Sequence, residues 1–197
     1  MTPRLVVLGL AFLPVLAQAQ AASVVPPATQ QITAAVLALP SEFRADARVL
    51  GYAAGKQGLV PLREGKGPFT CLASDPAAKG FHVACYHQSL EPFMARGRAL
   101  RASGVKGDQV DTVRFAEVRA KKLAVPAHPA SLYQLFGPPD AFDAATGTAP
   151  KAQALYIVYM PNATVASTGL SATPADGKMW LMFPGTPKAH IMFQPRM

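Results

Sequence analysis

Side chains capable of acid–base chemistry gather in one short stretch of the sequence, Phe81–Glu91, which contains His82, His87 and Glu91. A histidine titrates near neutral pH, and a carboxylate beside it can orient its ring, so this combination suits a hydrolase. Cys85 lies between the two histidines, and clustered His and Cys residues are also typical metal ligands. The first hypothesis is therefore a hydrolase, with or without a metal ion, whose candidate catalytic residues are His82, His87 and Glu91.

Strand geometry limits this hypothesis. Side chains alternate between the two faces of a strand, so His82 points away from both Cys85 and His87 if residues 81–86 are extended. Surface histidines with ordinary hydrogen bonds are the alternative interpretation. The same stretch leads from a predicted strand into a predicted helix, whose first backbone N–H groups favour an anion or a reacting oxygen.

A second group of candidate ligands lies near the C-terminus. A hairpin that turns between residues 185 and 186 would place His190 opposite Leu181 and Met192 opposite Met179. One face of the sheet would then carry His190, Met179 and Met192, and soft thioethers beside an imidazole can hold Cu(I). Methionine is also a common core residue, which is the alternative interpretation of this group. The sequence establishes no metal site or cofactor.

Positive charge is concentrated in residues 96–122, which contain eight Lys and Arg against three Asp and Glu, in a chain of formal net charge +8. Such a segment can attract an anionic surface or ligand, and Arg96, Arg98 and Arg101 are the candidate binding residues. The expected partner is an anionic envelope component or a partner protein. Nucleic acid is not expected, because the segment lacks the interleaved aromatic residues of a single-strand binder. A solvated helical face is the alternative interpretation.

The two cysteines, Cys71 and Cys85, predict a disulfide. If residues 69–73 pair antiparallel with residues 83–87, Cys71 lies directly opposite Cys85. Facing residues of an antiparallel pair approach within disulfide reach. The bond is expected to be structural, since no neighbouring group indicates a lowered thiol pKa.

Familiar catalytic motifs are missing: the sequence contains neither G-x-S-x-G nor H-E-x-x-H nor G-x-G-x-x-G. Two hypotheses of function remain. One is a non-enzymatic module that binds a ligand, an envelope component or a partner protein. The other is the hydrolase with its site in residues 82–91.

Alternating helical and extended patterns define the elements that would position these residues. Apolar residues with helical spacing predict a helix that Pro40 ends, with one more turn at residues 41–44. Four short strands follow, at residues 48–52, 59–63, 69–73 and 81–86, separated by Gly- and Pro-containing turns. A helix capped by Ser89 and stopped by Gly104 comes next, while residues 108–122 fit either a helix or a strand.

The last third of the chain is rich in strand formers. Residues 155–160 predict a strand, and residues 179–183 and 188–193 predict the C-terminal hairpin around Pro184–Pro187. Residues 137–151 are expected to form a loop. The order of elements predicts an α+β fold, an antiparallel sheet of short hairpin-linked strands with two or three helices packed on it.

The N-terminus predicts export. Arg4 precedes the apolar run Leu5–Leu16, and Ala17–Ala19 fits a small-x-small cleavage pattern, so residues 1–19 are expected to be a signal peptide. The protein is therefore expected in the periplasm or outside the cell. Residues 20–28 would form a flexible lead, and residues 29–197 a single α+β domain without a membrane-spanning segment.

Overall fold

The computed structural model describes residues 24–195, so the expected signal peptide lies outside the described residues. Its helical elements are α1 (Ala28–Val36), α2 (Ser41–Arg44), a 3-10 turn η1 (Gln88–Leu90), α3 (Glu91–Ala102), α4 (Gln109–Arg119) and α5 (Val165–Thr168). Its strands are β1 (Arg48–Gly51), β2 (Val60–Arg63), β3 (Phe69–Leu72), β4 (Phe81–His87), β5 (Ala130–Gly137), β6 (Gln153–Tyr159), β7 (Trp180–Met182) and β8 (His190–Phe193).

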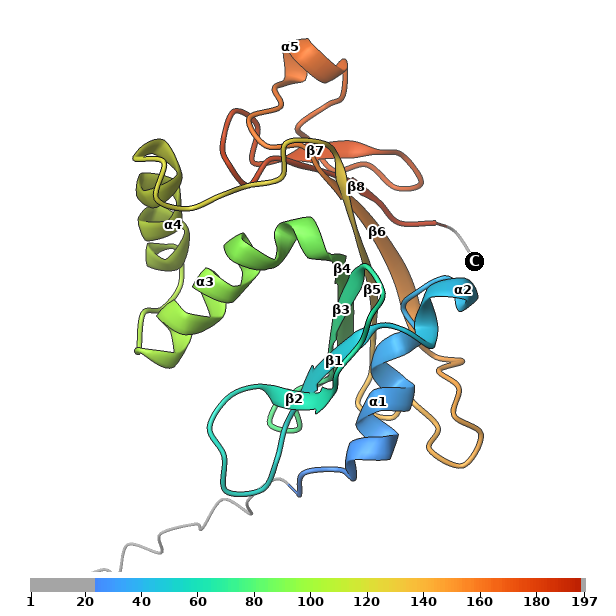
Figure 1. The fold of residues 1–197 in the computed structure, drawn as a ribbon. Helices are drawn as coiled ribbons and strands as arrows, with labels where there is room; N and C mark the ends of the chain where they lie inside the picture. The colour runs from blue at the N-terminus through green and yellow to red at the C-terminus, as the bar shows by residue number, and fades with distance from the viewer. Residues whose placement is uncertain (1–23, 196–197) are drawn as a thin grey trace, which may run out of the picture.

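All eight strands form one open sheet in the order β2-β1-β3-β4-β5-β6-β8-β7. Neighbouring strands are antiparallel except β1 and β3, which run parallel. The helix α1 packs on one face of this sheet and α3 on the other, with α4 beside α3 (Figure 1). The predicted α+β class with a largely antiparallel sheet is therefore confirmed.

Strand β4 shows why the sheet carries helices on both faces. Phe81, Val83 and Cys85 point to one side and belong to the core beneath α1. Ala84 and Tyr86 point to the other side and belong to the core that includes Leu90 at the start of α3. A strand with apolar residues at both parities is typical of a sheet buried on both faces.

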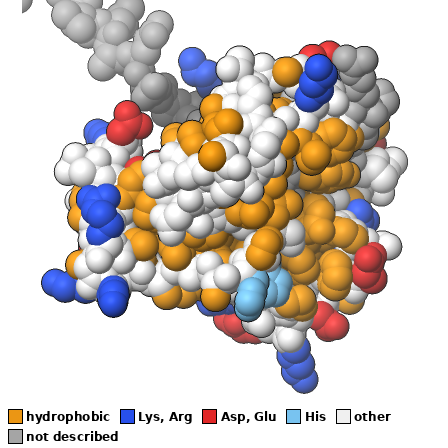
Figure 2. All heavy atoms as spheres, turned by 90° about the horizontal axis from the view of Figure 1, so that it is seen from above, with side chains coloured by type: hydrophobic (Ala, Val, Ile, Leu, Met, Phe, Trp, Pro, Cys, Tyr) orange, Lys and Arg blue, Asp and Glu red, His pale blue; other side chains and the backbone are white. Residues whose placement is uncertain are grey.

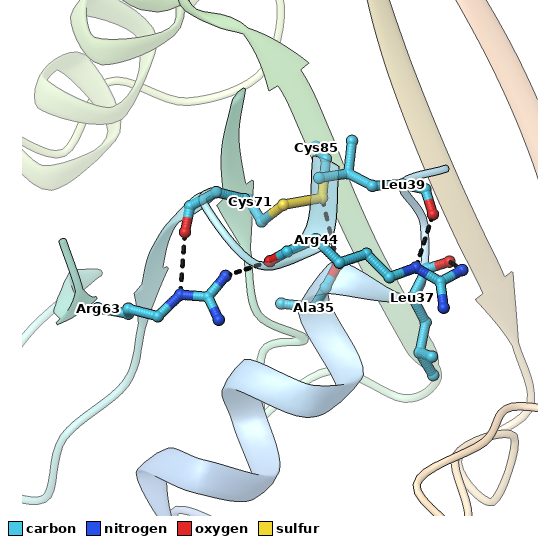
Figure 3. Close-up of a disulfide and its surroundings, with 8 residues drawn as sticks. Ala35, Leu37, Leu39, Arg44, Arg63, Cys71 and Cys85 are labelled. Atoms are coloured by element: carbon cyan, nitrogen blue, oxygen red, sulfur yellow. Dashed lines mark hydrogen bonds between the residues drawn. A yellow bond between two sulfur atoms is a disulfide. The ribbon is translucent and has the colours of Figure 1, made fainter. Parts of the chain in front are cut away.

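The predicted disulfide between Cys71 and Cys85 is confirmed. The two residues are opposite each other in the β3–β4 register, and their sulfur atoms lie 2.08 Å apart. Both are fully buried in the core beneath α1, where Cys85 Sγ lies 3.2 Å from the carbonyl oxygen of Ala35 (Figure 3).

Two arginines fix the segment between α1 and β1 beside this disulfide. Arg44 donates to the carbonyl oxygens of Leu39 and Leu37, at 2.8 and 3.1 Å. Arg63 of β2 donates to the carbonyl oxygens of Ala47 and Arg44, at 3.0 and 2.6 Å (Figure 3). These bonds give partners to backbone carbonyls in a connection that packs closely on the sheet, where an unpaired carbonyl would be costly.

Several elements differ from the prediction. Strand β5, which sequence analysis did not predict, lies in the centre of the sheet. Residues 108–122, which fitted either element, form the helix α4.

The expected cap of α3 is also wrong. The Ser89 backbone N–H donates to Nδ1 of His87, so His87 caps the 3-10 turn that leads into α3. Pro92 in the first turn and Gly104 at the end of the helix are as predicted; Gly104 has a φ of 89°, a backbone conformation that favours glycine.

The C-terminal hairpin is paired one residue away from the predicted register. His190 lies opposite Met182, and Met192 lies opposite Trp180. Leu181 therefore faces the other side of the sheet from His190. Phe183 adopts a φ of 53°, so β7 ends one residue early and the turn is longer than the four residues expected. A shift of one residue exchanges the faces of a strand.

The end of the molecule that carries α5 and β7 is apolar at its surface. Val165, Met179 and Phe183 are among the exposed large hydrophobic residues there. Figure 2 looks down on this end of the molecule and shows hydrophobic side chains across the middle, with charged side chains nearer the rim. No helix within residues 24–195 is long and apolar enough to cross a membrane.

Candidate functional site

A polar cluster lies between β4 and α3, where Tyr86, Glu91 and Arg98 meet. Arg98 donates from Nη1 to the Tyr86 hydroxyl and from Nη2 to Glu91 Oε1, each at 2.6 Å. The Tyr86 hydroxyl donates in turn to Glu91 Oε2. Arg48 of β1 adds a longer ion pair to Glu91 at 3.9 Å. The cluster orients the Arg98 guanidinium and balances much of its charge.

Local sequence explains how the cluster forms. Tyr86 points from β4 toward the face of the sheet that α3 covers, and it is only 1% exposed. Glu91 begins α3 and Arg98 lies two turns further on, so both project from the same side of the helix. Burial and the hydrogen bond to Glu91 raise the pKa of Tyr86 well above its ordinary value, so its hydroxyl remains protonated.

Beside this cluster, α3 and the β1–β2 connection enclose an open cleft of about 570 Å³. It is lined by Tyr52, Gln57, Gly58, Leu59, Arg98, Ala99, Arg101 and Ala102, and we call it the Arg101 cleft. No Asp or Glu is among these lining residues. The cleft therefore combines two guanidinium groups with small apolar side chains and a phenol.

Arg101 differs from Arg98 in having no counter-ion. Within residues 24–195 it forms no ion pair or side-chain hydrogen bond, and it is exposed. A Cβ atom placed on Gly97 would lie 3.2 Å from Arg101 Nη1 and 3.0 Å from Arg114 Nη1, so the Arg101 guanidinium lies back along α3, over that glycine and near the Arg114 guanidinium. Arg101 lines the cleft and has no counter-ion among the described residues.

Tyr52 supplies a neutral donor to the same cleft. Burial, with a smaller effect of the Asp75 charge, raises the pKa of Tyr52 to about 12. The phenol is protonated at neutral pH and can donate a hydrogen bond to an anion. Sequence analysis missed Tyr52 and Leu59, since residues in a strand and a loop gave no sign that they would face α3.

Arg96, the third arginine candidate, is committed to another helix. It binds Glu117 of α4 through three hydrogen bonds of 2.5 to 3.0 Å. The pKa of Glu117 is lowered chiefly by these hydrogen bonds. Of the three predicted binding arginines, the structure therefore brings Arg98 and Arg101 together and places Arg96 in a contact between helices.

The histidine candidates are not brought together with Glu91. His87 Nδ1 lies 2.9 Å from the Ser89 hydroxyl, and its ring packs edge-on against Phe69. His82 is exposed, opposite Phe136 of β5. No hydrogen bond or ion pair joins either histidine to Glu91 among the described residues.

His190 is buried at the other end of the sheet face that carries Tyr86. Its ring stacks on the Tyr159 ring, with 4.9 Å between the ring centroids, and is tilted against the Phe183 ring, with 5.7 Å between the centroids. Nδ1 lies 2.7 Å from the Lys188 carbonyl oxygen, which can only accept, so Nδ1 carries a proton. Burial lowers the pKa of His190, and the Lys188 charge lowers it further. His190 is therefore neutral at pH 7.

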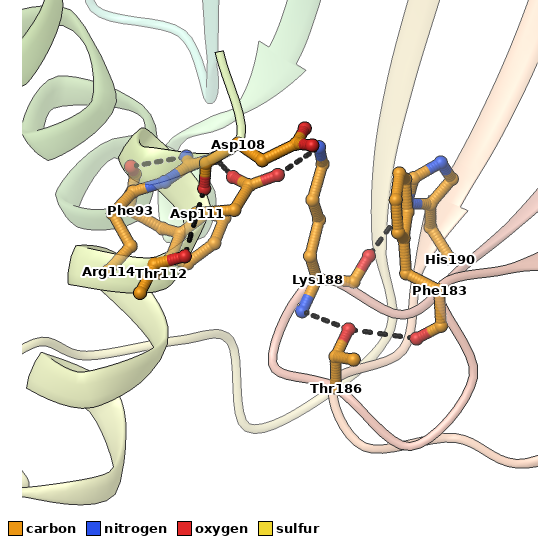
Figure 4. A network of polar contacts seen from close by, with 9 residues as sticks. All are labelled: Phe93, Asp108, Asp111, Thr112, Arg114, Phe183, Thr186, Lys188 and His190. Carbon is orange, nitrogen blue, oxygen red and sulfur yellow. Dashed lines mark hydrogen bonds and ion pairs between the residues drawn. The ribbon is translucent and has the colours of Figure 1, made fainter. Parts of the chain in front are cut away.

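His190 borders a second polar network, which ties α4 to the C-terminal hairpin (Figure 4). Asp111 of α4 accepts from Arg114 and, at 2.7 Å, from Lys188 Nζ. Arg114 is only 4% exposed; it lies 3.9 Å above the Phe93 ring and donates to the Phe93 carbonyl oxygen. Sequence analysis had no sign of this network, because its acid and its lysine lie far apart in the chain.

The register shift changes the group of candidate metal ligands at the C-terminus: Met192 stays on the face of His190, Met182 lies opposite His190, and Met179 falls outside the strand pairing. His190 is buried while Met179 precedes β7 and is 55% exposed. Among residues 24–195, no three His, Cys, Asp or Glu side chains are placed to hold a metal ion.

The Arg101 cleft is thus the place where the predicted binding residues and a cavity coincide. Tyr86 and Glu91 orient Arg98 in this cleft, and Arg101 is its arginine without an ion pair among the described residues. Comparison with known proteins adds no name to this arrangement: no family model, no curated protein and no solved structure matches the chain.

Proposed function

We propose that this protein is an exported binding module, without catalytic activity, that holds an anionic component of the cell envelope in the Arg101 cleft. One observation carries the proposal. The cleft is lined by two arginines and no carboxylate, and one of these arginines has no partner within the described residues. A phosphate or carboxylate group of a ligand would accept hydrogen bonds from the Arg101 guanidinium and balance its charge.

The two arginines have different parts in this proposal. Arg98 is held by Tyr86 and Glu91, so it forms a fixed wall of the cleft. Arg101 is the residue that would contact the anion, with the Tyr52 hydroxyl as an additional donor. Leu59, Ala99 and Ala102 would pack against a short apolar part of the ligand. The cleft volume falls within the range of about 300–1,000 Å³ that small-molecule sites occupy.

The surrounding surface favours the approach of an anion. Four more cations of residues 96–122 form no ion pair or hydrogen bond through their side chains among residues 24–195, namely Lys106, Arg119, Lys121 and Lys122. Their summed field would raise the local concentration of anions and would weaken with salt. Export supports an envelope ligand, since an exported protein meets the anionic groups of that compartment.

Calorimetric titration with glycerol 1-phosphate tests the proposal, with glycerol as the uncharged comparison. We expect binding of the phosphate only, weakened about tenfold in Arg101→Gln, because a hydrogen bond to a charged group contributes about 1.5–3 kcal/mol. Arg119→Gln is the matched control, since it removes the same charge from an exposed residue that does not line the cleft.

Two results would contradict the proposal. Equal weakening in both variants would indicate attraction to the basic surface as a whole. Binding that Arg101→Gln leaves unchanged would exclude the cleft. Thermal unfolding of each variant shows whether the fold has been preserved.

A further inference from the structure

A second cavity, of about 300 Å³, lies on the α1 side of the molecule. Its walls come from α1, from the connection between β3 and β4, and from the connection between β5 and β6. Gln31, Asp75, Phe81, Pro139 and Phe142 are among the lining residues. Three separate parts of the chain thus form a concave site that shares no lining residue with the Arg101 cleft.

Two polar side chains of this cavity, those of Gln31 and Ser74, are already used by the fold. Gln31 donates to the carbonyl oxygens of Pro26 and Tyr52 and accepts from the Tyr52 N–H. The Ser74 hydroxyl accepts from the His82 N–H. These groups shape the cavity, and their bonding capacity toward a ligand is reduced.

Asp75 is the one charged side chain among the described lining residues. Its Oδ1 accepts from the Ala77 N–H at 2.8 Å, a bond within its own turn. No Lys or Arg of residues 24–195 forms an ion pair with it. The cavity therefore has a net negative charge, opposite to that of the chain as a whole.

The rest of the wall is aromatic and apolar. The rings of Phe81 and Phe142 are stacked, with 6.2 Å between their centroids and an angle of 9° between their planes. Pro26, Pro76 and Pro139 add apolar surface. The faces of aromatic rings attract organic cations, and this attraction grows when the cation is removed from water.

We propose that this cavity binds a small organic ammonium ion, with its charge beside Asp75 and its apolar groups against Phe81, Phe142 and the prolines. An inorganic cation does not fit the same wall. Calcium takes six to eight oxygen ligands and magnesium requires near-octahedral oxygen coordination, whereas this cavity offers a single carboxylate. The volume lies at the lower end of the range for ligand sites, so the ligand is a compact amine.

Titration with choline, and with its uncharged isostere 3,3-dimethylbutan-1-ol, tests this proposal. We expect choline to bind at least tenfold more tightly than the alcohol, because the two differ in charge and hardly in shape. Asp75→Asn should abolish this preference. The asparagine Oδ1 can still accept from the Ala77 N–H, so the turn is retained.

Glu42→Gln is the matched control, because it neutralises an exposed carboxylate of α2 that does not line the cavity. It should leave choline binding unchanged, and Phe142→Leu should weaken it without changing the charge. Equal binding of choline and the alcohol, undiminished binding in Asp75→Asn, or no binding of choline would each overturn the proposal. Because the Asp75 charge also acts on Tyr52 of the Arg101 cleft, Arg101→Gln separates the two proposals: Arg101 does not line this cavity, so the variant should bind choline as the wild type does.

Discussion

At the scale of single residues, Tyr86 connects the sheet to the candidate site. Its ring is part of the core beneath α3, while its hydroxyl joins the Arg98 and Glu91 side chains. Buried polar groups are costly unless hydrogen-bonded, so this hydroxyl both depends on and stabilises the orientation of Arg98. The residue thus serves the fold and the site together.

Tyr86→Phe should therefore lower the free energy of unfolding by about 1–2 kcal/mol, since it removes two side-chain hydrogen bonds at a buried position. Urea unfolding monitored by circular dichroism measures the change. Tyr156→Phe is the control, because Tyr156 is 42% exposed and its hydroxyl forms no hydrogen bond within the described residues. A loss of the same size in both variants would show that the Tyr86 hydroxyl contributes nothing specific.

At the scale of elements, the disulfide fastens β3 to β4 at the centre of the α1-side core. Cys71 and Cys85 are 14 residues apart and both fully buried. The pairing of these strands also fixes the faces to which His87 and Tyr86 point, so the bond supports the position of the candidate residues indirectly.

Replacing both cysteines, Cys71→Ala with Cys85→Ala, should destabilise the oxidised protein by about 3 kcal/mol in the chain-entropy model for a loop of this size. The midpoint of guanidinium unfolding measures this loss. Under reducing conditions, the unfolding midpoint of the wild type should approach that of the double variant. Thiols that react in the native, unreduced wild type would contradict the bond.

The contact between α4 and the C-terminal hairpin is the second feature at this scale, and it should respond to pH. A lowered pKa for His190 in the folded state means that the unfolded chain binds more protons, so stability rises with pH. The contribution is complete above the ordinary histidine pKa of about 6.5 and is lost as the pH falls through the folded pKa. Burial acts to raise the pKa of Asp111, but Lys188 and Arg114 outweigh it and lower the pKa. Asp111 therefore stays ionised over this window.

Lowering the pH from 7 to 5 should consequently destabilise the wild type, because a protonated His190 would be placed beside Lys188 and near the charge pair of Arg114 and Asp111. His190→Gln should have a flatter pH dependence over this interval. His128→Gln, which changes an exposed loop histidine, should keep the dependence of the wild type. Melting temperatures between pH 5 and 7 measure all three proteins, and identical slopes would contradict the assignment to His190.

At the scale of the whole molecule, the distribution of charge is the feature that supports the proposed anionic ligand. The chain has a formal net charge of +8, and five carboxylates form ion pairs among the described residues, while several arginines and lysines on the surface form none. A basic surface beside a cleft suits a protein that meets anionic envelope components.

The predicted signal peptide implies a defined mature chain. The protein recovered from the exporting cell should begin at Gln20, because Ala17 and Ala19 fit the small residues that signal peptidases require. Intact mass spectrometry measures the N-terminus, and Ala19→Arg should delay processing. Recovery of the species that begins at Met1 in a membrane fraction would contradict cleavage.

The amino-acid sequence alone determined the local elements and their chemistry. Turn residues and apolar periodicity predicted the first four strands and α3 closely, and the predicted strand register placed Cys71 opposite Cys85. These features depend on neighbouring residues, so a linear pattern contains them. It also indicated that Arg98 and Arg101 belong to one basic helix.

Only the tertiary structure decided which of these residues meet. The position of β5 in the sheet centre, the one-residue shift of the β7–β8 hairpin, and the pairing of Asp111 with Lys188 all depend on contacts between distant parts of the chain. The same holds for the Arg101 cleft, where a strand end and a loop come to face α3. A sequence allows several strand registers and faces about equally, and packing selects among them. The Arg101 cleft, the surroundings of the histidines and the cavity on the α1 side could therefore not be predicted from the sequence.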